Sequence, residues 1–196
     1  MILAIRRYTN ATFSGWANHL RPLLGRIGND RRGVSSIEFA IMLPLMLTLY
    51  LGSVEVSTGI STDRKVTLTS YALADLASQY TDITNADMTN ILSATAAIMA
   101  PYSSAGLQAV ISELSVNAQG QASVVWSDTL NGTALTVGQQ VNIPSALAVP
   151  NTYLIVAQVQ YNYNPAFGYV ITGPLTLTDQ SIVHPRQSNS VARTAS

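Results

Sequence analysis

The stretch GVSSIEFAIMLPLMLTLYLGSVE, residues 33–55, decides the architecture of this chain. Glu38 and Glu55 enclose sixteen residues without a formal charge. At about 1.5 Å of rise per residue, a helix separates these glutamates by roughly 25 Å, slightly less than a hydrocarbon core of about 30 Å. Uncharged neighbours on both sides can lengthen the span. We therefore predict a transmembrane helix over residues 34–60 that continues into the residues beyond.

The alternative for this stretch is a buried core helix of a soluble protein. Apolar side chains occupy every face of the segment, whereas a helix at the surface of a soluble domain shows a polar face. The pattern favours the membrane.

Charge is distributed unevenly along the 196 residues, although the formal net charge is zero. Up to Gly33 there are six arginines and one acid, or +5, and from Val34 onward four basic residues and nine acids, or −5. Positive residues stay on the cytoplasmic side of a membrane helix. Residues 1–33 are therefore predicted to be a basic cytoplasmic leader, with the chain after the helix outside. The leader is too long for a conventional secretory signal, and no small-x-small cleavage site follows the helix.

Composition argues against several kinds of chemistry. The chain has no cysteine and two histidines, so a thiolate metal site is impossible and a multi-histidine site is disfavoured. The acids are scattered, and we find no phosphate-binding loop, nucleophile elbow or paired-carboxylate motif. We expect no catalytic residue, cofactor or metal, and no nucleic-acid partner, because the exported part is negatively charged. An anchored periplasmic enzyme is the least favoured alternative.

Glu38 would be costly in the first turn of a membrane helix unless it were paired. Gly33, four residues, Glu38 and Phe39 then precede the apolar helix. This arrangement resembles the processing site of type IV prepilins, in which a membrane aspartyl peptidase cuts after the glycine and leaves glutamate at the fifth mature position. The resemblance implies processing between Gly33 and Val34.

The residue types suit such a site. Glycine offers the peptidase an unhindered, extended backbone. Cleavage would give Val34 an ammonium group near the Glu38 carboxylate of its own or a neighbouring subunit. The alternative is a simple anchor, with Gly33 as N-cap and Glu38 facing the helix dipole.

The longer run resembles the N-terminal domain of the TadE and TadG group of tight-adherence pilus proteins. The matching residues are Gly33, Glu38, Phe39, Ala40, Leu43, Pro44, Gly52 and Glu55. In the second half of the chain, Ile143-Pro144, Tyr161-Asn162-Tyr163-Asn164-Pro165 and His184-Pro185-Arg186 are also similar. Ser35 and Ser36 stand where alanine is more usual.

The resemblance implies a minor pilin or pseudopilin of a Tad-type (type IVc) pilus. Such a protein is single-pass in the bacterial inner membrane, with a periplasmic C-terminal domain, and can enter the pilus. Its implied partners are a prepilin peptidase, other pilins and pseudopilins, and pilus platform proteins. The implied assembly residues are Glu38, Phe39, Pro44, Gly52 and Glu55. The alternative is a permanently anchored envelope scaffold or partner-binding protein of the same machinery, which is never cleaved.

The exported part predicts an α+β fold, in which a long pilin-like helix precedes an extracytoplasmic domain over residues 61–186. Apolar or small residues that recur from Val66 to Tyr80 predict that the membrane helix continues outward. A second helix is predicted over 87–99, capped by Thr84 and ended by Pro101. Periodicity and turn residues also predict an antiparallel sheet: a hairpin over 110–116 and 122–126, and strands over 153–163 and 175–182. Residues 128–150 are expected to be a long loop, and 187–196 a polar, disordered tail.

Tyr161, Tyr163 and Tyr169 leave two alternatives open. They suit a sugar-binding or adhesive surface, yet aromatics at alternate strand positions more often pack in a core or along an edge.

Overall fold

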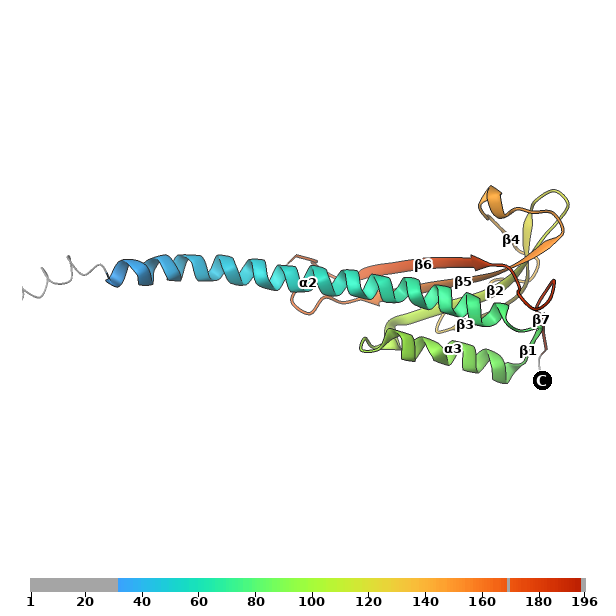
Figure 1. Ribbon diagram of the computed structural model, residues 1–196, viewed down its shortest axis with the longest axis horizontal. Helices are drawn as coiled ribbons and strands as arrows, with labels where there is room; N and C mark the ends of the chain where they lie inside the picture. Colours follow the sequence, from blue (N-terminus) through green and yellow to red (C-terminus); the bar gives the residue numbers. More distant parts are fainter. Residues whose placement is uncertain (1–31, 169, 195–196) are drawn as a thin grey trace, which may run out of the picture. The chain divides into compact units, whose positions relative to one another are not determined.

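The computed structural model describes residues 32–168 and 170–194 (Figure 1). Most of the predicted leader, residues 1–31, lies outside this part of the chain. The elements in chain order are α2 (Arg32–Ser78), β1 (Asp82–Ile83), α3 (Asn85–Met99), the short 3-10 helix η1 (Ser104–Gly106), β2 (Leu107–Val116), β3 (Ala122–Leu130), β4 (Gln140–Val141), the 3-10 helix η2 (Ser145–Leu147), β5 (Thr152–Tyr163), β6 (Leu175–Val183) and β7 (Ala192–Arg193). The predicted α+β fold, with a long N-terminal helix before a helix and an antiparallel sheet, is confirmed.

The chain divides into two compact units at Tyr50. The described part of the first unit is helical throughout, and its large apolar side chains are exposed. Pro44 lies inside this helix, and the carbonyl of Pro44 accepts a hydrogen bond from Thr48 Oγ1 at 2.8 Å. α2 is long and apolar enough to cross a membrane, and only 6% of its most apolar window is buried. One such N-terminal helix is what a single-pass membrane anchor requires.

The second unit, Leu51–Ser196, is built on a five-stranded sheet of order β4-β3-β2-β5-β6. All neighbouring strands in this sheet are antiparallel. Figure 1 shows α3 alongside the C-terminal part of α2, and both helices contribute to one buried cluster with the sheet. Because successive strand side chains alternate between faces, Ile111, Ala157 and Val159 reach this cluster while Gln158 and Gln160 point the other way. The main core therefore lies between the helices and one face of the sheet.

A second, smaller cluster covers one end of the opposite face. A register shift between Glu113 and Leu114 precedes it, and it contains Leu114, Val124, Leu154 and Val156. Leu135, Val141, Ile143 and Leu147 from the segment between β3 and β5 pack against it. The region predicted as a long loop thus contains β4 and η2. It covers the smaller cluster, because its apolar residues lie at the positions that contact the sheet.

The predicted cap of α3 by Thr84 is confirmed, although the helix begins at Asn85, two residues before the predicted start at Asp87. Asp87 N donates to Thr84 Oγ1 at 3.2 Å, and Thr84 N donates to Asp87 Oδ2 at 3.1 Å. This reciprocal capping box satisfies two backbone donors at the helix start. The helix ends at Met99, two residues before Pro101.

The prediction of a disordered tail over residues 187–196 is wrong for the described residues 187–194. Val191 is fully buried, and β7 pairs in parallel with β1. The Arg193 guanidinium forms an ion pair with Asp128 at 2.8 Å. The prediction relied on the polar composition of this segment. The segment is nevertheless held against the domain by one buried apolar side chain, Val191, and by several backbone hydrogen bonds.

Candidate functional site

The predicted processing residues lie at the beginning of α2. This helix begins at Arg32, so Gly33 lies in its first turn. The processing-site interpretation expected an extended backbone at Gly33, and the simple-anchor interpretation expected an N-cap there. Gly33 is helical instead. Apart from the neighbouring residues and the helix backbone itself, no described atom comes within 4 Å of a Cβ built on Gly33, and Val34 is exposed. A peptidase would have to unwind this turn, which glycine makes about 1 kcal/mol easier than alanine.

The next residues of the predicted site are equally accessible. Glu38 is exposed, and so are Phe39 and Pro44. The two ion pairs in the described part of the chain join Arg186 to Asp75 and Arg193 to Asp128, so neither includes Glu38. The exposed Glu38 carboxylate can be reached by groups from outside the chain.

Glu55 has a different environment, because it is 2% exposed. Its Oε1 accepts a hydrogen bond from Gly168 N at 2.7 Å, and its Oε2 accepts one from Val170 N at 2.8 Å. Both donors belong to the connection between β5 and β6, residues 164–174, which we call the docked loop. Two backbone N–H groups on one carboxylate form a strong, charge-assisted contact. Gly168 has a φ of +67°, a backbone conformation that glycine adopts readily.

Glycines make room for the docked loop on α2. A Cβ on Gly52 would lie 2.9 Å from Val170 Cγ2, and one on Gly59 would lie 3.4 Å from Ile171 Cδ1. Gly52, Glu55 and Gly59 are spaced by three and four residues, so they share one helix face. The Gly-x-x-Glu part of the motif is therefore a seat for the docked loop.

The predicted site thus has two parts. Gly33, Val34, Glu38, Phe39 and Pro44 are exposed, whereas Gly52 and Glu55 contact the docked loop. Only the first part is accessible to other molecules in this structure.

Tyr161 and Tyr163 are buried and belong to the main core, which favours packing over a sugar-binding surface. Burial, together with the nearby Glu55 carboxylate, raises the pKa of Tyr163. Tyr169 lies outside the described residues.

Sequence reasoning missed a second buried carboxylate, Glu113, which is 1% exposed. Its Oε1 accepts from Val191 N at 2.6 Å, while the Val191 carbonyl accepts from Trp126 Nε1 at 2.7 Å. Burial raises the pKa of Glu113, and the hydrogen bonds from Val191 and Trp126 partly oppose that shift. The sequence did hold one signal for this residue. Glu113 lies two residues after Ile111 on the same strand, so its side chain points toward the same, buried face.

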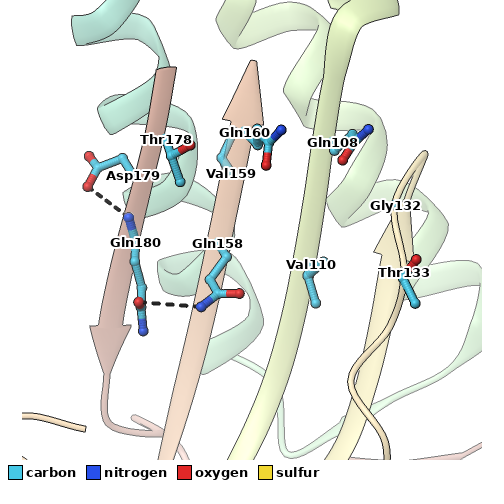
Figure 2. Close-up of a pocket in the computed structure, with 10 residues that line it drawn as sticks. All are labelled: Gln108, Val110, Gly132, Thr133, Gln158, Val159, Gln160, Thr178, Asp179 and Gln180. Carbon is cyan, nitrogen blue, oxygen red and sulfur yellow. Dashed lines mark hydrogen bonds between the residues drawn. The ribbon is translucent and has the colours of Figure 1, made fainter. Parts of the chain in front are cut away.

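The open part of the sheet face carries a groove of about 360 Å³ lined mainly by uncharged polar side chains. Figure 2 shows Gln108, Gln158, Gln160 and Gln180 on neighbouring strands, with Gln158 Nε2 donating to Gln180 Oε1 at 3.4 Å. The one carboxylate in the lining, Asp179, accepts from the adjacent Gln180 N. Within residues 32–168 and 170–194, no group of three or more possible metal ligands occurs.

Residues 33–75 match the family model described as TadE-like protein. The matched segment begins at Gly33 and includes Glu38, Phe39, Pro44, Gly52 and Glu55, so the predicted family resemblance is confirmed over these residues. The match indicates involvement in the assembly of a tight-adherence pilus. Neither the search of curated proteins nor that of solved structures found a match.

Proposed function

From the TadE-like match over residues 33–75, we propose that this protein is a minor pilin or pseudopilin of a Tad-type pilus. In this proposal α2 anchors the precursor in the bacterial inner membrane, with the leader in the cytoplasm and the domain in the periplasm. A prepilin peptidase then removes residues 1–33. The observation that carries the proposal is that one segment combines the family match, the Gly33–Glu38 spacing and a helix able to span a membrane.

Glu38 has a specific task in this proposal. A carboxylate within the apolar part of a membrane is expensive unless a positive group compensates it. Cleavage after Gly33 creates an ammonium group on Val34, and the exposed Glu38 can pair with that group on its own or a neighbouring subunit. The exposed apolar side chains of α2, including Phe39, would then pack against helices of other pilins and pseudopilins. Pilus platform proteins would move the processed subunit out of the membrane.

Gly52 and Glu55 support assembly indirectly. Their contacts lie within the chain, since they seat the docked loop on α2. We assign them the task of holding the docked loop on the part of α2 that belongs to the second unit while the helix packs with its partners.

The mature N-terminus of the protein from its native host tests the cleavage step. Mass spectrometry is expected to find Val34 as the first residue. Gly33→Ala should leave the full-length precursor, whereas Ser35→Ala, which introduces the more usual family residue, should be processed normally. An intact leader on the wild-type protein would overturn the cleavage.

A second experiment separates membrane insertion from assembly. Glu38→Gln should insert into the inner membrane in the same amount as the wild type but be depleted from sheared surface fibres, because the ammonium group loses its partner. Glu38→Asp, which keeps the charge, should be less depleted. Equal recovery of Glu38→Gln and wild type in fibres would contradict the task assigned to Glu38.

The alternative is a permanently anchored scaffold of the same machinery. The intramolecular use of Gly52 and Glu55 favours it, because it leaves two of the seven predicted site residues with a purely structural task. Wild-type protein found in sheared fibres would contradict this alternative.

A further inference from the structure

An exposed apolar surface gathers where the docked loop meets α2. On the loop side Phe167 is 51% exposed and Val170 is 55% exposed, and Leu175, at the start of β6, is 43% exposed. Val54, Val56 and Ile60 are also exposed on the adjoining part of α2. No formal charge occurs anywhere between Asp128 and Asp179, so the loop carries none. Exposed apolar patches of this kind mark contact with a partner or a membrane.

Because Glu55 is buried, the exposed surface of α2 stays uncharged over a longer part of the helix than the sequence alone indicates. With its carboxylate beneath the docked loop, no charged side chain is exposed from Phe39 to Thr62, a run of 24 residues. At about 1.5 Å per residue this run measures roughly 36 Å, whereas a hydrocarbon core is about 30 Å thick. The uncharged surface is therefore longer than the hydrocarbon core. The part of α2 that extends beyond the core consists of the turns that contact the docked loop.

The first exposed charged residues after this run indicate where α2 leaves the membrane and enters water. Asp63 and Arg64 are exposed directly after this run, while Lys65 Nζ donates to the Ile98 carbonyl at 2.9 Å. Gly59, which contacts the docked loop through Ile171, lies only about one helical turn before these charges. The loop seat thus occupies the last uncharged turns of α2, at the level expected for the headgroup region.

The backbone of the loop is prepared for a water-poor environment. Irregular backbone at membrane depth requires partners from the protein for its polar groups. Glu55 supplies such partners to the N–H groups of Gly168 and Val170. The same two hydrogen bonds compensate the Glu55 charge, so neither the loop nor α2 between Phe39 and Thr62 presents an exposed charge to the lipid.

We propose that the docked loop lies on the lipid surface, with Phe167, Val170 and Leu175 inserted between the headgroups and the acyl chains on the periplasmic side of the membrane that α2 crosses. The partner is the bilayer itself, because Val170 and Ile171 lie against Gly52 and Gly59 of α2, and the same turns of α2 carry the exposed Val54, Val56 and Ile60. An element of this kind lies in the membrane interface through its apolar face. The inference rests on the proposed anchoring of α2.

The absence of native cysteine allows single nitroxide labels to be placed in the full-length chain. We suggest Phe167→Cys for the loop, Val137→Cys as a matched control that is 68% exposed on the connection between β3 and β4, and Leu45→Cys as a reference within α2. The protein is reconstituted in vesicles of phosphatidylethanolamine and phosphatidylglycerol. Collision with oxygen, which concentrates in lipid, is then compared with collision with a neutral nickel chelate, which stays in water.

The label at residue 167 is expected to collide several-fold less often with the chelate, relative to oxygen, than the label at residue 137. The label at residue 45 should be protected more strongly still. If residue 45 is protected but residue 167 behaves as residue 137 does, the loop inference is overturned and the anchor stands. If residue 45 also behaves as a water-exposed site, the anchoring proposal and the inference fail together.

Discussion

Two buried glutamates, Glu55 and Glu113, each hold a segment that is distant in sequence. Glu55 accepts from the backbone of residues 168 and 170, and Glu113 accepts from the backbone of Val191. A buried carboxylate is tolerated only when hydrogen bonds compensate its charge. Each glutamate therefore determines where a loop or terminal segment can attach.

The contribution of Glu55 can be tested with Glu55→Ala. We expect faster hydrogen exchange at the Gly168 and Val170 amides, corresponding to a loss of about 1–3 kcal/mol, because both donors lose their acceptor. Ser57→Ala, which changes an exposed residue on the same helix, should leave these amides protected. Unchanged exchange in Glu55→Ala would show that the loop is held by apolar packing alone.

Glu113 makes the stability of the domain depend on pH. Its pKa is raised in the folded state, so between the unfolded value and the folded value the folded protein binds more protons than the unfolded chain. The contribution of Glu113 to stability is therefore greatest below the unfolded pKa and is lost as pH rises through the folded pKa. Glu113→Gln keeps an acceptor for Val191 N and removes the titration.

Urea unfolding of the full-length protein in detergent, between pH 4 and about pH 8, measures this effect. The free energy of unfolding of the wild type should fall relative to that of Glu113→Gln as pH rises through the window. A difference that is independent of pH would contradict the raised pKa.

At the scale of elements, α2 changes its surroundings along its length. From Gly52 onward the buried positions follow steps of three and four residues: Gly52, Glu55, Gly59, Thr62, Val66, Thr69 and Leu73. The predicted stripe began at Val66, because the glycines and the glutamate before it do not resemble core residues. Close approach of the loop to the helix requires small side chains there, and Glu55 is compensated by hydrogen bonds.

α3 depends on its capping box for a defined start. Thr84→Ala removes the side-chain acceptor of Asp87 N and should lower the free energy of unfolding by about 1 kcal/mol. Thr89→Ala is the matched control, because Thr89 is exposed inside the same helix and alanine has the higher helix propensity. Chemical denaturation of both variants measures the difference. Equal stability of the two variants would contradict a stabilising cap.

At the scale of the whole domain, the C-terminal segment connects parts that are remote in sequence. Arg186 N donates to the Ser78 carbonyl at the end of α2 at 2.8 Å, and the Arg186 side chain pairs with Asp75. Val191 then reaches Glu113 and Trp126, and Arg193 reaches Asp128. The segment therefore closes the domain across α2, β2 and β3.

Deletion of residues 187–196 tests this closure. We expect a loss of roughly 3 kcal/mol or more, since Glu113 and the Trp126 indole each lose a buried partner at about 1–3 kcal/mol. Asn189→Ala, an exposed change in the same segment, should be nearly neutral. Thermal unfolding followed by circular dichroism reports both. A deletion as stable as the wild type would contradict the closing function of the segment.

The sequence by itself determined the features that depend on local order. The uncharged run after Glu38 specifies a long helix, the Thr84–Asp87 spacing specifies the start of α3, and alternation specifies the hairpin and the strand over residues 152–163. The family resemblance was visible for the same reason, because the residues that carry it lie close together between Gly33 and Glu55.

Only the tertiary structure decided what the buried polar residues do. Glu55 and Gly52 meet a loop more than 100 residues later in the chain, and Glu113 meets the C-terminal segment. The order of the residues does not encode such distant contacts in any local pattern. They follow from the packing of α2 and α3 on one face of the sheet, which brings the loop and the terminal segment to carboxylates that burial leaves in need of donors.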